Sequence, residues 1–481
     1  MTDPSARDIT DLDATAQADL VRSGQASPSD LVEAAIARLD EVNPALNAVI
    51  HDLRDRARAE AMSASLPDGP FRGVPFVVKD LDGTLGGAPF HQGNRLLKAI
   101  GHVAARDSTL IARLRGAGLI ALGKSNTPEF GLQPTTEPEA YGPTHNPWDL
   151  ARGPGGSSGG SGAAVAARVV PVGHAGDGGG SIRFPASANG LVGLKPGRGR
   201  ISLGPDEGEP WNGFVARGVL TRSVRDTAAI LDAVQGAVPG DPSAAPGRHG
   251  THVEAATTDP QPLRIGLLTR APAGMAETMP ACVEATEAAA RTLEGLGHHV
   301  EAAAPSALDE GLIANFITVL ATNVATDLEE LAVIAGRPVT ADDVEAITWT
   351  YNEMGRAMTG VQVQQALREV HAWSRRMLAW WEDFDILLTP TLAEIPPMLG
   401  DLARPDDPGT AVGRATPFVA YCAPFNVTGQ PAISIPTGTS PEGLPVGVQA
   451  VAGAWREDRC LAIAGQLERA MPWAGRRPGA V

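Results

Sequence analysis

The chain has 481 residues, 43% of them hydrophobic and 20% charged, which is the composition of a globular protein and unlike that of a disordered one. Its 55 acidic residues outnumber its 39 basic residues, and the formal charge of −16 disfavours nucleic acid and anionic membranes as partners. A small-molecule ligand fits this charge better, so we expect no nucleic-acid partner and no membrane partner.

The first predicted element is a helix near the N-terminus. Ser27 precedes a proline and is followed three positions later by Asp30, which is a helix-entry pattern. The apolar residues that follow recur at helical spacing and predict an amphipathic helix over 28–42. The next element is GVPFVVKDLDG at 73–83, where an apolar run bounded by glycine and proline predicts a buried strand ending at Lys79.

Helices and buried strands alternate along the rest of the chain. The patterns predict helices over 107–118, 223–234 and 278–296, and strands in the segments LIALGKSN, LRIGLL and HHVEAAAP. Between 237 and 262, small residues and prolines dominate and predict a long surface connection. This alternation indicates an α/β protein with a sheet between helical layers.

Three features of the sequence bear on the cellular location of the protein. The N-terminal segment MTDPSARDITDLDA is acidic and lacks the basic and then apolar regions of a secretion signal. The apolar stretch LIANFITVLATNVA is too short and too often interrupted by polar residues to span a bilayer. Cys282, Cys422 and Cys460 lie far apart without a CxxC pair, which indicates reduced, mostly buried thiols. We therefore expect a cytoplasmic protein.

The segment GPGGSSGGSG at 153–162 has the composition of a flexible linker. It leads, however, directly into the apolar AAVAARVVPVGHA, where a linker would have stayed polar. A second glycine cluster, GDGGGSIRFPA at 176–186, follows within one crossover. We therefore interpret the run as constrained backbone rather than a tether.

The second glycine cluster has the chemistry of an oxyanion hole. Glycine lacks a Cβ, which lets backbone N–H groups approach a ligand closely. Gly178, Gly179 and Gly180 would place such donors beside the hydroxyl of Ser181. A serine nucleophile also needs a base, which must come from elsewhere in the chain.

The segments GVPFVVKD, GGSSGGSGAAVAA and GDGGGSIRFPASANGLVGLKP resemble, in order and spacing, the three signature regions of the amidase signature hydrolases. The likeness covers nearly the whole chain, and NPALNAVI, TTEPEAYG and NPWDL are most similar to the nylon-oligomer branch of that family. The resemblance implies a single domain over 1–481 with a catalytic core over about 70–235. It also implies a central mixed β-sheet covered by helices on both faces.

By this resemblance Ser181 is the nucleophile, Ser157 is the bridging serine that follows a cis peptide bond, and Lys79 is the final base. Lys79 would accept the proton of Ser157 while Ser157 accepts that of Ser181, and an acyl-enzyme would form. A lysine accepts a proton only when neutral, so burial must lower its ordinary pKa of roughly 10.4. The resemblance also implies that Phe130 and Gly131 line the acyl pocket. Gly178 stands where many family members have a larger residue, which predicts either a looser oxyanion loop or a wider pocket.

Two other motifs compete with this interpretation. Ser158 completes a G-x-S-x-G pattern, the nucleophile elbow of another hydrolase class, with His174 and Asp177 as conceivable partners. The residues before it, RGPGG, are not the apolar strand that an elbow follows. The segment GLIALGKS satisfies the phosphate-loop pattern and would place Lys124 and Ser125 on a nucleotide. Its LIAL, however, is an apolar strand where a phosphate loop has its loop.

Two basic sites receive structural interpretations. His298 and His299 lack partners at metal-ligand spacing, and we expect them to be surface residues without a metal. Substrate binding is one interpretation of Arg183, but this residue follows Asp177 closely, and we expect a structural ion pair that supports the glycine turn.

We therefore expect a cofactor-free amidase that cleaves C–N bonds of linear or cyclic amides, nylon-type oligomers included. Carbamates are a second substrate class, because relatives in the family cleave urethanes. The partner would be a small-molecule amide or carbamate, and a homodimer is left open. The alternatives are a nucleotide-binding ATPase of the phosphate-loop type and a non-catalytic subunit of an amidotransferase. Loops set the substrate in such folds, and one sequence does not rank them.

Overall fold

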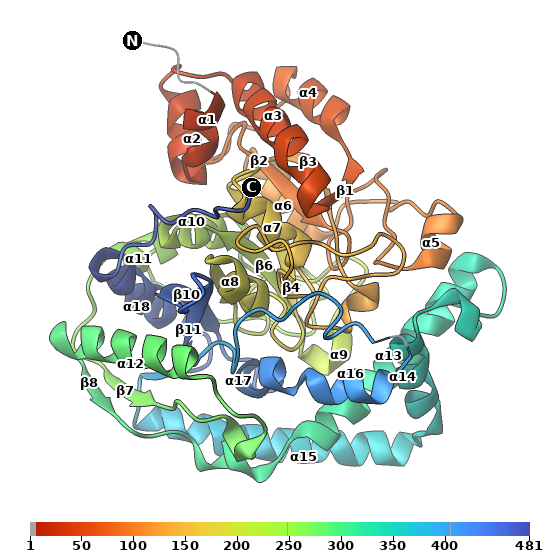
Figure 1. The fold of residues 1–481 in the computed structure, drawn as a ribbon, viewed down its shortest axis with the longest axis vertical. Helices are drawn as coiled ribbons and strands as arrows, with labels where there is room; N and C mark the ends of the chain where they lie inside the picture. The colour runs from red at the N-terminus through yellow and green to blue at the C-terminus, as the bar shows by residue number, and fades with distance from the viewer. Residues whose placement is uncertain (1–5, 248, 405) are drawn as a thin grey trace.

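The centre of the molecule is a mixed sheet of 11 strands in the order β1-β3-β2-β4-β6-β5-β10-β11-β9-β7-β8 (Figure 1). The computed structural model describes residues 6–247, 249–404 and 406–481. The strands are β1 (Val49–Asp52), β2 (Pro75–Lys79), β3 (Ile120–Ser125), β4 (Val172–Asp177), β5 (Val192–Lys195), β6 (Ala216–Thr221), β7 (Arg264–Leu267), β8 (His299–Glu301), β9 (Ile386–Pro390), β10 (Ala432–Thr439) and β11 (Pro445–Ala452).

The helices surround this sheet. They are α1 (Ala6–Asp11), α2 (Ala14–Arg22), α3 (Pro28–Leu46), α4 (Arg54–Met62), α5 (Arg95–Ala99), α6 (Thr109–Gly116), α7 (Gly159–Ala166), α8 (Arg183–Asn189), α9 (Pro210–Gly213), α10 (Val224–Val234), α11 (His252–Thr257), α12 (Pro280–Gly295), α13 (Ile313–Ala335), α14 (Ala346–Ala357), α15 (Gly360–Ala379), α16 (Pro408–Arg414), α17 (Thr416–Val427) and α18 (Glu457–Ala470). In Figure 1 the helices α1 to α4 lie at the top of the view, α12 at the lower left and α15 at the bottom.

Alternate side chains of the strands enter two different cores, because successive side chains of a strand point to opposite faces. In β2, Phe76 and Val78 join a core shared with α6, α10, α12 and α18, whereas Val77 joins a core with α3 and α7. In β9, Leu388 belongs to the first core and Leu387 to a third, built with α13 and α15. The sheet is therefore covered by helices on both faces, as expected.

The register of the strands brings two segments of the candidate site together. β2 pairs in parallel with both β3 and β4. The carboxyl ends of parallel strands meet at one edge of a sheet, so Lys79 at the end of β2 and Asp177 at the end of β4 lie at the same edge. The glycine turn after Asp177 consequently starts beside Lys79.

Most predicted elements occur close to their expected bounds. Ser27 caps α3 through the hydrogen bonds of a capping box with Asp30, and Ser223 caps α10. α3 continues to Leu46, beyond the predicted end at residue 42, and contains Pro44. In the described part of the chain, none of the helices is long and apolar enough to cross a bilayer.

The predicted surface connection over 237–262 contains the short helix α11, which Thr251 caps. The expectation for His298 was wrong. His298 is buried with 6% of its surface exposed, its Nδ1 accepts from the N–H of Leu263, and its Nε2 lies 2.8 Å from Gln466 Oε1. His299 is exposed, as expected. The glycine before His298 is typical of an exposed turn, and the local sequence does not show that α18, which carries Gln466, covers this histidine.

Candidate active site

The glycine-serine run is part of the core. Every residue of 153–162 is buried, and the run enters α7 at Gly159. At Gly156 and Gly160 an added Cβ would lie 2.3 Å and 2.4 Å from neighbouring backbone atoms, so glycine is required there by close approach. The peptide bond between Gly156 and Ser157 is cis. The run therefore fixes the position of the Ser157 side chain.

Lys79 is fully buried at the end of β2. Its Nζ donates to Ser157 Oγ at 2.8 Å and to Asp82 Oδ2 at 2.7 Å. Burial lowers the pKa of this ammonium group, while the Asp82 carboxylate acts in the opposite direction. Lys79 thus makes direct contact with one of the two predicted serines and with a carboxylate that the sequence did not single out.

Ser181 lies in the turn between β4 and α8, with 8% of its surface exposed. Its hydroxyl has no hydrogen-bond partner among the described residues, and it lines the same cavity as Ser157. The N–H groups of 178–181 donate no hydrogen bond to the described part of the chain. Free donors and a free hydroxyl therefore occur side by side, as the oxyanion-hole interpretation of Gly178, Gly179 and Gly180 requires. The catalytic roles stay predictions.

The turn that carries Ser181 is held by a buried ion pair. Asp177 accepts from the N–H of Ile182 at 3.1 Å and from Arg183 Nη2 at 2.8 Å. Burial of Asp177 works against ionisation, but the attraction of Arg183 and the hydrogen bonds outweigh it and lower its pKa to about 2. Asn426 of α17 completes the network, because its side chain donates to the Asp177 carboxylate at 2.9 Å. The predicted structural ion pair is confirmed.

A cavity of about 700 Å³ opens in front of the two serines. Phe130 and Gly131 line it from a 3₁₀ turn at Glu129–Gly131, and their role in an acyl pocket stays a prediction. A Cβ added at Gly131 would lie 3.1 Å from Ser157 Oγ, so this glycine leaves room beside the hydroxyl. Volume and lining suit a small organic molecule.

Further walls of the cavity come from segments that sequence reasoning missed. Phe316 and Leu320 of α13 and Trp211 of α9 line it. The ring of Trp211 lies 2.8 Å from the point where a Cβ of Gly178 would stand. The wider pocket predicted at Gly178 is therefore not found there, because Trp211 fills the space. Nothing in the local sequence indicated this pairing.

One side of the cavity is acidic. Its carboxylates are those of Asp206, Glu207, Glu209, Asp327 and Glu330. Burial and the nearby carboxylates of Glu330 and Glu207 raise the pKa of Asp327 to about 7. We refer to these five residues as the acidic rim.

Asp82 links the rim to the serines. Its Oδ1 lies 3.9 Å from Nε of Arg217 on β6, and Arg217 pairs with Glu207 at 2.6 Å. Asp82 has a φ of 65°, in the left-handed region that aspartate and asparagine tolerate better than most residues. The Asp-Gly pair directly after a buried strand was the available signal for a turn at this point.

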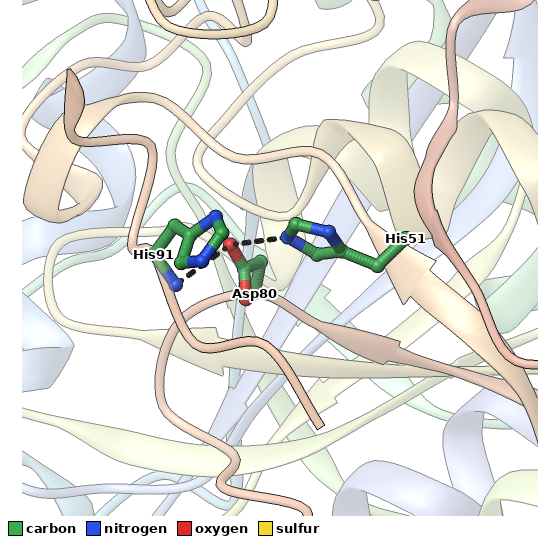
Figure 2. A group of neighbouring side chains, drawn as sticks. All are labelled: His51, Asp80 and His91. Carbon is green, nitrogen blue, oxygen red and sulfur yellow. Dashed lines mark hydrogen bonds and ion pairs between the residues drawn. The ribbon is translucent and has the colours of Figure 1, made fainter. Parts of the chain in front are cut away.

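A second polar cluster lies directly after β2, where Figure 2 shows His51 and His91 on either side of Asp80. His51 Nε2 lies 3.3 Å from Asp80 Oδ2. One potential metal-ligand atom from each of the three side chains lies within 4.8 Å of the other two. The charge of Asp80 is already compensated by Lys124, whose Nζ lies 2.7 Å from Asp80 Oδ1. Because of this ion pair we describe the cluster as a hydrogen-bonded network and assign no metal to it.

The competing motifs lack the geometry that they require. Ser158 Oγ donates to the carbonyl of Gly176 in the interior, and neither ring nitrogen of His174 has a partner among the described residues. These residues therefore form no Ser-His-Asp triad. In the phosphate-loop segment, residues 120–125 form β3, and Ser125 Oγ lies 2.7 Å from Ser161 Oγ. A strand stands where the loop should be, so this motif match is accidental.

Known proteins are similar to nearly the whole length of the chain. A family model described as Amidase matches residues 30–461. The 6-aminohexanoate-cyclic-dimer hydrolases of Pseudomonas sp. (strain NK87) and Paenarthrobacter ureafaciens are 44% identical over 478 residues, which cover 97% of this chain and 96% of theirs.

Solved structures are also similar to nearly the whole chain. A structure of 6-aminohexanoate cyclic dimer hydrolase complexed with substrate matches with a TM-score of 0.93 at 42% identity, covering 98% of this chain and 99% of that chain. A bacterial aryl acylamidase described as a member of the amidase signature enzymes matches with a TM-score of 0.86 at 28% identity over 98% of both chains.

Proposed function

Because the chain belongs to the amidase signature family, whose members hydrolyse C–N bonds, we propose that it cleaves amides through Ser181, Ser157 and Lys79. The observation that carries the proposal is the hydrogen bond of 2.8 Å between Lys79 Nζ and Ser157 Oγ at the cavity that Ser181 also lines. A buried amine next to a hydroxyl is a base of the kind that a serine nucleophile needs.

In this mechanism Ser181 Oγ attacks the carbonyl carbon of the amide. Its proton passes to Ser157 Oγ, and the proton of Ser157 passes to Lys79 Nζ. The N–H groups of the glycine turn hold the oxyanion of the tetrahedral intermediate, where losing one donor typically costs about 10²–10³ in rate. When the C–N bond breaks, the same relay returns the proton to the leaving amine. Water then releases the acyl group from Ser181 by the same sequence.

Several features bear on the substrate. The 44% identity to cyclic-dimer hydrolases supports cyclic and linear amides of the nylon-oligomer type. The cavity of about 700 Å³ has room for such a molecule. A carbamate presents a similar carbonyl and leaving amine, so the same relay serves a urethane substrate.

The experiment for the nucleophile is labelling with a serine-directed fluorophosphonate followed by peptide mass mapping. We expect label on Ser181 and loss of activity in step with labelling. Ser158→Ala is the matched control, since Ser158 is buried and bonded to a carbonyl, and label should still reach Ser181. Label on Ser158, or inactivation with Ser181 unmodified, would overturn the assignment.

A product-analysis panel ranks the substrate classes. It compares aliphatic amides, anilides, cyclic and linear aminohexanoate dimers and aryl carbamates with the purified chain. Turnover of any of them argues against a non-catalytic subunit. An equilibrium ATP-binding measurement tests the nucleotide alternative, and we expect no binding.

A further inference from the structure

We propose that Asp82 is a positioning residue that holds the Lys79 ammonium and so sets the pH range in which this lysine serves as a base. The inference rests on the proposed function, because it concerns the charge state of the proposed base. Nothing in the family resemblance required a carboxylate at this position.

The geometry makes Asp82 a direct partner of Lys79. Lys79 Nζ stands between Asp82 Oδ2 at 2.7 Å and Ser157 Oγ at 2.8 Å. The Lys79 side chain is fully shielded from solvent and the Asp82 side chain is 15% exposed, so water screens this ion pair little. A charged Lys79 is stabilised by the carboxylate, and a charged Lys79 takes no proton from Ser157.

Other charged groups face the ammonium from the surrounding elements. Asp177 at the end of β4 raises the pKa of Lys79, and Arg217 on β6 lowers it. His174 on β4 is neutral, because burial lowers its pKa to about 3. Among these groups Asp82 alone makes an ion pair with Lys79 within the described residues. Asp82 therefore has the largest favourable influence on the ammonium.

Arg217 opposes Asp82. Its Nε lies 3.9 Å from Asp82 Oδ1, and that nitrogen has no hydrogen-bond partner among the described residues. The guanidinium competes with Lys79 for the Asp82 carboxylate and repels the ammonium directly. Burial lowers the pKa of Lys79, and the Asp82 carboxylate and the Arg217 guanidinium then act on it in opposite directions.

The backbone is arranged to admit this carboxylate. A Cβ at Gly176 would lie 2.1 Å from Asp82 Oδ2, so the carboxylate occupies space that any other residue at 176 would take. The φ of 65° at Asp82 suits asparagine equally well. Asp82→Asn consequently removes the charge while keeping the shape and the backbone conformation.

The proposal has a consequence that a purely structural role lacks. Asp82 makes Lys79 a stronger base but keeps more of it protonated at neutral pH. Removing the carboxylate should therefore raise the rate of Ser181 attack at low pH, where the neutral amine is scarce. It should lower that rate at high pH, where the base strength of Lys79 is limiting. Burial opposes ionisation of Asp82, but the attraction of Lys79 and Arg217 outweighs it and lowers the pKa of this carboxyl. No bond to the carboxylate forms or breaks.

The test measures the rate at which a fluorophosphonate labels Ser181 as a function of pH, which requires no knowledge of the substrate. In the wild type we expect the rate to rise with pH as Lys79 loses its proton. In Asp82→Asn the rise should move to lower pH by about 1 to 3 units, the usual effect of one adjacent opposite charge. Its alkaline plateau should fall below that of the wild type, so that the two profiles cross.

Variants of Arg217 test the same balance from the other side. Arg217→Gln should move the rise to higher pH, and Arg217→Lys, which keeps the charge, should leave it closer to the wild type. If Asp82→Asn does not fold, an unshifted rise in Arg217→Gln overturns the proposal. Asp107→Asn is the matched control, because the Asp107 side chain is 17% exposed, close to the 15% of Asp82, and its ion pair with Arg115 lies off the cavity lining. Its profile should keep the wild-type position.

The outcomes separate the two hypotheses. A labelled Ser181 with coinciding rises in the wild type, Asp82→Asn and Arg217→Gln overturns the inference and leaves the proposed function standing. A uniform loss of rate at every pH, without a shift, also overturns it and assigns Asp82 a structural role. Absence of label on wild-type Ser181 at any pH overturns the proposed function and this inference with it.

Discussion

Lys79 is the residue at which burial and charge act against each other. Removal from water favours the neutral amine, and the contact with Asp82 favours the ammonium. A lysine is suited to this position because its pKa responds to its surroundings, whereas an arginine stays charged. The proposed chemistry depends on that responsiveness.

We expect Lys79→Ala to lose hydrolytic activity by at least about 10²–10⁴-fold, the usual contribution of a general base. The fold should persist, because Asp82 keeps Arg217 as a neighbouring cation. Activity on the best substrate of the panel and the thermal unfolding midpoint measure the two effects. Lys98→Ala, which removes an exposed lysine off the cavity lining, should stay active. An active Lys79→Ala enzyme would exclude the role assigned to this residue.

At the scale of elements, the turn between β4 and α8 is the best-supported part of the site. Its Asp177–Arg183 pair is fully buried, and the Arg183 side chain also donates to Gln449 at 2.8 Å. The pair ties the turn to the sheet through hydrogen bonds, in addition to the apolar packing of Ile182 in the core. The N–H groups of the turn are thereby held in fixed positions.

We expect Asp177→Asn to lower the free energy of unfolding at pH 7 by about 3–5 kcal/mol, because it leaves Arg183 buried without its counter-charge. The wild-type carboxylate has a folded pKa of about 2, below its unfolded value, so its stabilisation is present above about pH 4. That stabilisation is lost as the pH falls toward 2, and the difference between wild type and variant should shrink over this interval. Urea unfolding of both proteins at a series of pH values measures this difference in the free energy of unfolding.

Asp309 provides the comparison for this prediction. Its pKa is also lowered to about 2, by Arg270, but its side chain is 42% exposed. Solvent screening limits such a pair to roughly 0–1 kcal/mol, so Asp309→Asn should change stability little. Equal losses in the two variants would contradict the importance assigned to burial.

The local parts of the site could be predicted from the sequence, and the parts made by packing could not. The buried strand ending at Lys79 and the glycine turn before Ser181 are contiguous segments with their own signals. Trp211 and Phe316, by contrast, reach the cavity from α9 and α13, and their positions follow from how distant helices pack. Asp82 was missed because a short Asp-Gly turn gives no indication of which way its carboxylate points.

For the whole molecule, the three cysteines report on the intact core. Cys282, Cys422 and Cys460 are free and buried, as expected. Burial raises the pKa of the Cys282 and Cys422 thiols to about 12 and raises that of Cys460 as well. The thiolate is the reactive form, so all three should be inert in the folded protein.

We expect no reaction of the native protein with Ellman's reagent and reaction of all three thiols in denaturant, with the thiol release following global unfolding. Iodoacetamide should leave amidase activity unchanged, which also distinguishes a serine from a cysteine nucleophile. Rapid modification of one thiol under native conditions would contradict the burial of that cysteine.

The acidic rim also affects the release of the two reaction products from the cavity. Cleavage of an amide at neutral pH yields one carboxylate and one ammonium, and the rim repels the first and attracts the second. The acid product should therefore dissociate from the cavity faster than the amine product. Added salt should reduce this difference in dissociation rate, because it screens the charges of the rim. Inhibition by the two halves of a cleaved molecule would then be unequal, with the amine half the stronger inhibitor.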